Sequence, residues 1–171
     1  MGRGPKFIIL RGPSGAGKST VAKHLHVQSK RKVVLIEQDY YREQILNGNE
    51  GTKKASKVMR LEMFETDICI ALKHGFDVIV EGILNPETYI PVFENIRKDH
   101  PNENYMFYFD ISLDETFRRH ANRSKSTRFG TDEMKEWYKF AKHSGLEWEV
   151  IIPEESSIDE TVTDIKVITG L

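Results

Sequence analysis

The sequence predicts an α/β protein in which helices cover both faces of one parallel β-sheet. Short runs of apolar, β-branched or aromatic residues recur along the chain, at residues 6–10, 32–36, 77–80, 105–111 and 149–152. These runs are nearly continuous rather than alternating, which is typical of strands buried on both faces. Segments with helical spacing separate the runs, so strand and helix alternate, and the pattern predicts a three-layer sandwich.

The helices between these strands have recognisable signals. The first helix follows the glycine-rich turn after residues 6–10, and residues 47–56 predict a polar loop before the next helix. That next helix carries an apolar stripe that ends before Gly75, formed by Val58, Leu61, Phe64, Ile68, Ala71 and Leu72. Asn85 and Pro86 predict the N-cap and first turn of a further helix. Capping boxes at residues 112–115 and 157–160 predict the last helix starts.

Size and composition bound the class of protein. The chain has 171 residues, 39% hydrophobic and 30% charged, which is typical of one globular domain spanning residues 1–171. No apolar run reaches the length of a membrane span, and the N-terminus lacks the apolar segment of a secretory signal. The single cysteine, Cys69, excludes an internal disulfide framework and fits a reducing compartment. We therefore expect a cytoplasmic protein that does not engage a membrane.

A glycine-rich turn follows the first predicted strand. Residues 12–19 read Gly-Pro-Ser-Gly-Ala-Gly-Lys-Ser, a full match to the phosphate-binding pattern G-x-x-x-x-G-K-[ST] between a strand and a helix. Backbone N–H groups and the helix N-terminus cradle phosphates in such a turn. We expect Lys18 to reach the β- and γ-phosphates of ATP and the Ser19 hydroxyl to hold Mg²⁺. The predicted nucleotide-binding residues of this turn are Gly12, Pro13, Ser14, Gly15, Ala16, Gly17, Lys18, Ser19 and Thr20.

The segment after the second predicted strand reads Ile-Glu-Gln-Asp-Tyr-Tyr-Arg. Here the chain resembles the small P-loop kinases that phosphorylate hydroxyls, most closely the 5′-kinase domain of polynucleotide kinases, the zeta toxins and chloramphenicol phosphotransferase. In those families an Asp at this strand end accepts the hydroxyl proton, and an Arg shortly after it binds the acceptor. The resemblance assigns these roles to Asp39 and Arg42. The alternatives are a helix N-cap for Asp39 and a solvated helix residue for Arg42.

The third predicted strand ends in Val-Ile-Val-Glu-Gly, which places Glu81 at the tip of a buried strand. A carboxylate in that position can hold Mg²⁺ through water or contact the acceptor. The alternative is a strand-end carboxylate that is satisfied by its neighbours. The chain contains no N-K-x-D guanine motif, which disfavours a GTPase.

Arginines follow the fourth predicted strand. Arg119 and Arg123 are four residues apart and share one helix face. With residues 122–133 they resemble the lid of nucleotide and shikimate-type kinases, whose arginines stack on adenine and clamp the phosphates. The resemblance assigns nucleotide binding to Arg119 and a catalytic role to Arg123, and a solvated basic face is the alternative. The same families imply strand order 2-3-1-4-5 and place residues 152–156 beside the adenine.

The sequence predicts no functional role for His120 or Trp137. The histidines of the chain show no metal-ligand spacing, and we expect His120 on the lid surface rather than as an acid or base. Trp137 is expected to pack a helix.

These observations predict a kinase that uses ATP and Mg²⁺ to phosphorylate a hydroxyl of a small or medium acceptor. Nucleosides, sugars, an antibiotic and a nucleic-acid end all remain candidate acceptors. The net charge of −1 weighs against long polynucleotides, which need a basic groove. The alternative class is a nucleotide-dependent regulatory or binding protein without an acceptor, and such a protein has no need of Asp39 at an acceptor hydroxyl.

Overall fold

The computed structural model describes residues 4–45, 53–121 and 130–171. Within these ranges five parallel strands form one sheet in the order β2-β3-β1-β4-β5. The strands are β1 (Phe7–Arg11), β2 (Val33–Glu37), β3 (Asp77–Gly82), β4 (Asn104–Asp110) and β5 (Glu149–Pro153). The predicted α/β class and strand order are therefore confirmed.

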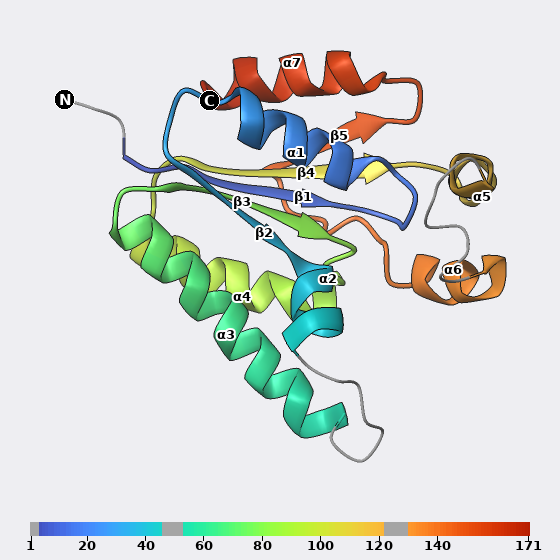
Figure 1. Ribbon diagram of the computed structural model, residues 1–171, viewed down its shortest axis with the longest axis horizontal. Coiled ribbons are helices and arrows are strands. Elements are labelled where there is room, and N and C mark those ends of the chain that lie inside the picture. The colour runs from blue at the N-terminus through green and yellow to red at the C-terminus, as the bar shows by residue number, and fades with distance from the viewer. Residues whose placement is uncertain (1–3, 46–52, 122–129) are drawn as a thin grey trace.

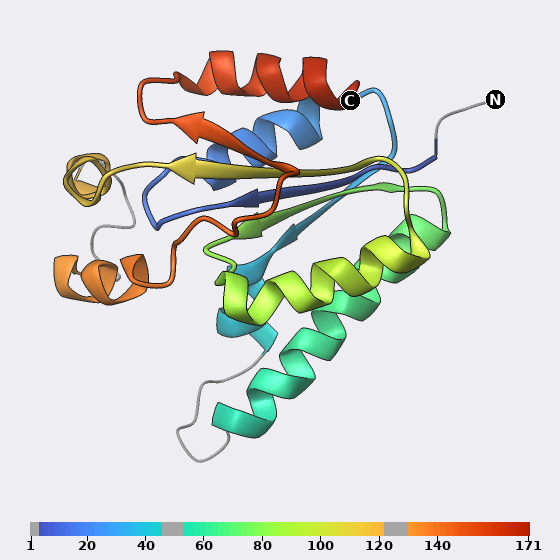
Figure 2. The ribbon, with the colours of Figure 1, turned by 180° about the vertical axis from the view of Figure 1, so that it is seen from behind.

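Helices lie on both faces of the sheet and at one of its ends (Figures 1 and 2). One face is covered by α1 (Lys18–Gln28) and α7 (Ile158–Thr169), and the other by α3 (Lys53–Lys73) and α4 (Pro86–Asp99). The carboxyl ends of the strands carry α2 (Gln38–Tyr40), the π-helical turn η1 (Tyr41–Ile45), α5 (Leu113–Ala121) and α6 (Thr131–Tyr138). No helix in the described ranges is long and apolar enough to cross a membrane.

The central strand β1 is buried along its whole length. Successive side chains of a strand point to opposite faces, so β1 contributes to two cores. Phe7 and Ile9 pack with residues of α3 and α4, and Ile8 and Leu10 pack with residues of α1 and α7. This double burial explains why the strand reads as a continuous apolar run.

The helix starts largely follow the sequence signals. The Asn85 side chain accepts a hydrogen bond from the Glu87 backbone N–H at 3.1 Å, and Pro86 opens α4. Ser157 and Glu160 form the predicted reciprocal capping box at the start of α7. The loop predicted over residues 47–56 is wrong at its end, because α3 already begins at Lys53.

The last residue of β1, Arg11, is a fully buried charge. Its guanidinium forms an ion pair with Glu149 of β5, donates to the Lys142 carbonyl at 2.5 Å, and lies 5.0 Å from the Tyr108 ring centre. Glu149 also accepts a hydrogen bond from the Ser144 N–H at 2.7 Å. Both buried charges are thus satisfied, and the segment before β5 is fixed to the sheet.

Glu149→Ala should lower the free energy of unfolding by about 3–5 kcal/mol, because Arg11 is left as an unpaired buried charge. The double variant Arg11→Met, Glu149→Leu should have a free energy of unfolding much closer to that of the parent protein. It removes the desolvation cost of the two charges together with their attraction. Urea unfolding followed by circular dichroism measures both values. Equal destabilisation of the single and double variants would contradict this account.

Candidate active site

The loop between β1 and α1 holds three glycines, Gly12, Gly15 and Gly17, at positive φ values that other residues rarely adopt. Gly12 has φ +144°, and a Cβ there would lie 2.8 Å from the Phe109 carbonyl oxygen. Gly17 has φ +101° and precedes α1, and within the described residues no side chain caps that helix. The N-terminus of α1 is therefore open to an anion, as a phosphate-binding loop requires.

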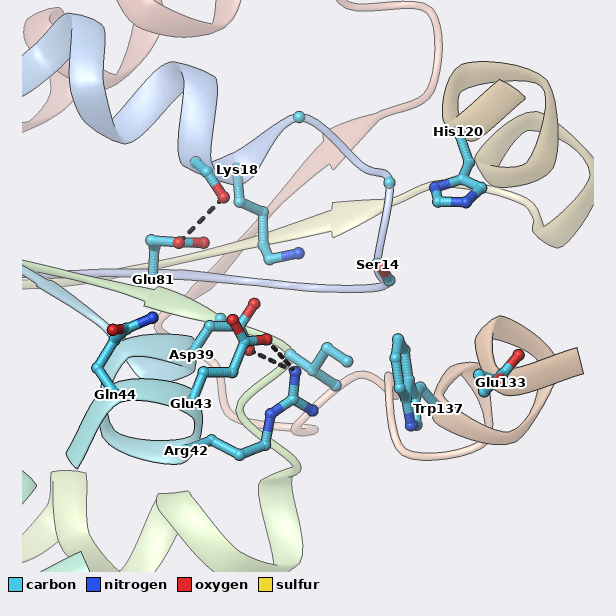
Figure 3. Close-up of a pocket in the computed structure, with 15 residues that line it drawn as sticks. Ser14, Lys18, Asp39, Arg42, Glu43, Gln44, Glu81, His120, Glu133 and Trp137 are labelled. Carbon is cyan, nitrogen blue, oxygen red and sulfur yellow. Dashed lines mark hydrogen bonds and ion pairs between the residues drawn. The ribbon is translucent and has the colours of Figure 1, made fainter. Parts of the chain in front are cut away.

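Lys18 lies along this loop rather than in solvent. Its side chain is only 6% exposed, and its Nζ donates a hydrogen bond to the Pro13 carbonyl at 2.7 Å. Figure 3 shows the Lys18 ammonium above the space that separates α2 from α6. The fold thus holds a positive charge beside the loop backbone before any ligand binds.

Ser19 and Glu81 form a polar contact at the end of the loop. The Ser19 hydroxyl donates to Glu81 Oε1 at 3.0 Å, and this joins the first turn of α1 to the end of β3. A hydroxyl and a carboxylate are hard oxygen donors of the kind that Mg²⁺ takes. The described residues contain no cluster of three or more His, Cys, Asp or Glu side chains that could form an all-protein metal cage. The donor set therefore fits an ion that completes its shell with phosphate and water.

Glu81 is a buried carboxyl, and only 5% of the residue is exposed. Burial raises the pKa of this carboxyl above its ordinary value, while the Lys18 charge and the Ser19 hydrogen bond oppose that rise. The charges of Asp39 and Glu37 raise the pKa further. A cation at this position would offset the same cost of burial.

Asp39 and Arg42 meet directly after β2. The Arg42 guanidinium lies 3.0 Å from Asp39 Oδ1 and 3.2 Å from Glu43 Oε1, so it holds two carboxylates. The N-cap alternative for Asp39 is wrong, because Glu37 occupies the N-cap position and Asp39 lies within α2. Arg42 is part exposed, with 40% of its side chain accessible, but it is ion-paired and lies 5.3 Å from the Trp137 ring centre.

A cavity of about 660 Å³ brings these groups together. Figure 3 shows Asp39, Arg42 and Glu43 on one side, Trp137 on the other, and Lys18 above them. The cavity is lined by Ser14, Gly15, Gly17, Lys18, Ser19, Asp39, Arg42, Glu43, Gln44, Glu81, Gly82, Ile83, His120, Glu133 and Trp137. Segments from five parts of the sequence therefore share one hollow at the carboxyl ends of the strands, where ligands bind in open α/β sheets.

Sequence reasoning missed part of this lining. His120 was expected on a lid surface, but it is buried, with 5% exposure, and it lines the cavity. Trp137 packs against the Arg42 guanidinium and lines the cavity as well. Neither residue belongs to a local motif, and only the position of α5 and α6 over the strand ends brings them to the site.

Arg119 lies outside this cavity lining and makes structural contacts. It donates to the Ala16 carbonyl at 3.2 Å, to the Glu154 carbonyl at 3.0 Å and to Glu115 at 2.6 Å. It therefore joins the phosphate-binding loop to the segment after β5, which the family resemblance places beside adenine. Arg123 and residues 122–129 of the predicted lid lie outside the described residues.

Comparisons with known proteins agree with this fold. Residues 7–143, most of the chain, match the family model of an AAA domain, whereas no curated protein matches the chain. The APS kinase of Mycobacterium tuberculosis in complex with AMPPNP and APS is 15% identical, with a TM-score of 0.75 over 99% of this chain and 100% of that chain.

Two further solved structures share the same arrangement. A gluconokinase from Sinorhizobium meliloti is 16% identical, with a TM-score of 0.66 over 99% of this chain and 96% of that chain. The tunicamycin resistance protein of Deinococcus radiodurans is 12% identical, with a TM-score of 0.66 over 97% of this chain and 96% of that chain. At such identities the likeness shows the fold alone.

Glu81→Gln should stabilise the protein at about pH 8 in the absence of ligand. A carboxyl whose pKa is raised on folding binds its proton more tightly when folded, so its contribution to stability is present at low pH and is lost as the pH rises through the raised pKa. The advantage of the variant should therefore shrink as the pH falls toward about 4. Thermal unfolding over this pH range measures it, and a variant that is less stable than the parent at high pH would contradict the assignment.

Proposed function

We propose that this chain, which belongs to the AAA domain family, is an ATP-dependent kinase that phosphorylates a hydroxyl of a small-molecule acceptor. The observation that carries the proposal is the shared cavity, in which Asp39 and Arg42 face the same space as Lys18 of the phosphate-binding loop. A nucleotide switch needs the loop, but it does not need an ion-paired carboxylate across from it. Two of the similar structures are described as kinases, one with a nucleotide analogue and APS bound, which supports the same class of activity.

In this proposal the phosphates of ATP bind the backbone of residues 12–20, with the N-terminus of α1 behind them. Lys18 turns from the Pro13 carbonyl toward the β- and γ-phosphates and neutralises charge that develops on the transferred group. Ser19 and Glu81 would hold Mg²⁺, which supplies further charge neutralisation when bound. Arg119 would keep the adenine side of the site in place through its contacts with Ala16 and Glu154.

Asp39 is the proposed base. The acceptor oxygen attacks the γ-phosphorus, the bond from that phosphorus to the bridging oxygen breaks, and ADP leaves. The hydroxyl proton passes to the Asp39 carboxylate. Arg42 orients this carboxylate through their 3.0 Å ion pair and contacts the acceptor.

The proposal also covers the acceptor, the domain and the cellular compartment. The acceptor is a small molecule, with a nucleic-acid end as the other candidate, and the site belongs to a single domain over residues 1–171. The protein works in the cytoplasm, where ATP is available. Arg123, outside the described residues, is proposed as a further charge on the transferred group.

Lys18→Ala should reduce turnover by about a hundredfold or more, because one charge on the transferred phosphoryl group is lost. Lys23→Ala is the matched control, since Lys23 lies on the same helix and forms an exposed pair with Glu37 at 3.4 Å. Consumption of ATP with a library of hydroxyl compounds is the assay. Normal turnover by a folded Lys18→Ala protein would refute the kinase proposal.

Asp39→Asn should leave ATP affinity nearly unchanged and reduce transfer by about a hundredfold to ten-thousandfold, the usual contribution of a positioned base. Glu43→Gln removes the other carboxylate that pairs with Arg42, and it should reduce the rate of transfer by less than about tenfold. Calorimetry with AMPPNP, together with phosphorylation of the best acceptor in the library, separates binding from transfer. If Asp39→Asn transfers at the parental rate, Asp39 is not the base, and the regulatory alternative gains support.

A further inference from the structure

A second cavity, of about 310 Å³, adjoins the active-site cavity. Asp39, Arg42, Ile83 and Trp137 line both, so a molecule in the second cavity can reach the proposed base. Its other walls come from α2, α3, the start of α4 and the segment after α6. They are formed by Gln38, Lys57, Arg60, Asn85, Thr88, Tyr89 and Phe140.

Positive charge dominates this second cavity. Arg42, Lys57 and Arg60 line it, and among its described lining residues the one carboxylate is Asp39, which is already paired with Arg42. Charged groups gathered in a concave site attract ligands of the opposite sign. The lining of the second cavity therefore favours an anionic ligand, although the whole chain has a net charge of −1.

Arg60, which lines the second cavity, has a buried hydrogen-bond donor without an acceptor among the described residues. In the described part of the chain its Nε is buried and has no hydrogen-bond partner. The Tyr89 hydroxyl accepts from Gln38 at 2.9 Å, and burial raises its pKa while the nearby Arg60 opposes that rise. A buried guanidinium N–H without an acceptor is costly, and an anionic oxygen satisfies it through a charge-assisted bond.

The same cavity also has an apolar side. Ile83, Trp137 and Phe140 contribute to it, and Phe140 is half exposed although it is a large aromatic residue. Aromatic side chains around a polar anchor are typical of small-molecule sites in which a flat or apolar body lies against the rings.

We propose that the second cavity binds an anionic oxygen group of the acceptor, such as a phosphate or carboxylate, through Arg60 and Lys57. The flat or apolar body of the acceptor lies against Trp137 and Phe140, and its hydroxyl points to Asp39. The inference rests on the proposed kinase function and narrows its substrate class to anionic hydroxyl compounds. Uncharged sugars and polyols leave Arg60 without a partner and are poor acceptors.

The test uses three aromatic probes on the full chain saturated with Mg²⁺ and AMPPNP, so that the phosphate-binding loop is occupied. Phenyl phosphate, benzoate and benzyl alcohol share a ring and differ in the attached group. Phenyl phosphate should bind about tenfold or more tightly than benzyl alcohol, the effect of one charge-assisted bond. It should also shift the NMR resonance of the Arg60 Nε–H, which is identified by its absence from Arg60→Gln.

Arg60→Gln should abolish this preference, whereas Lys73→Gln, which removes a charge at the exposed end of the same helix, should keep it. Lys57→Gln is the second variant if Arg60→Gln does not fold, and it should reduce the preference. Tight binding of benzoate would support a carboxylate acceptor, and weak binding would support a phosphoryl or sulfuryl acceptor. Equal binding of phenyl phosphate and benzyl alcohol, or a preference that survives in Arg60→Gln, would overturn the inference.

The two proposals fail separately. Retained turnover in Lys18→Ala would refute the proposed kinase activity but would not alter the binding of phenyl phosphate to the second cavity. Equal binding of the probes would refute the anionic acceptor but would leave ATP turnover intact.

Discussion

Burial of β1 between β3 and β4 is the constraint on which the site depends. The parallel register pairs Leu10 with Glu81 and Arg11 with Gly82, so β1 and β3 end at the same level. The chain must then turn sharply from the buried strand into α1, and Gly12 permits that turn at φ +144°. Since β2 pairs Glu37 with Glu81, the residues that follow β2 reach the same edge. The sheet thus brings the phosphate-binding loop, Glu81 and Asp39 together without long loops.

The site concentrates charge in a way that costs stability. Glu81 is buried beside Lys18, and burial holds the pKa of its carboxyl above the ordinary range. Arg42 is shared between Asp39 and Glu43, so this one arginine faces two carboxylates. Such concentrations of charge are typical of functional sites, because a bound ligand or cation completes the charge balance. The buried pair of Arg11 and Glu149 differs, since both partners are satisfied within the protein.

Local sequence patterns predicted the fold and the phosphate-binding loop. Residues that reach the site only through contacts between distant segments could not be predicted. The strands were visible as apolar runs, and β1 and β3 are indeed buried, whereas β5 exposes Val150 and Ile151. The phosphate-binding loop was visible because its glycines, Lys18 and Ser19 are contiguous. Trp137 could not be assigned, since it meets Arg42 only after α6 folds over the strand ends. The role of Arg60 was equally hidden, because a helical arginine looks solvated in sequence until its burial is known. The N-cap alternative for Asp39 failed because β2 extends to Glu37 and the helical turn starts one residue before Asp39.

In the proposed function the cavity transfers a phosphoryl group and does not merely bind a nucleotide. The most direct measurement follows the label from ATP labelled at the γ-phosphate, in the presence of anionic hydroxyl compounds and their uncharged counterparts. We expect label in a phosphorylated anionic compound, with little transfer to the uncharged one. Label that appears only as inorganic phosphate, at the same rate in the parent protein and in Asp39→Asn, would contradict this proposal.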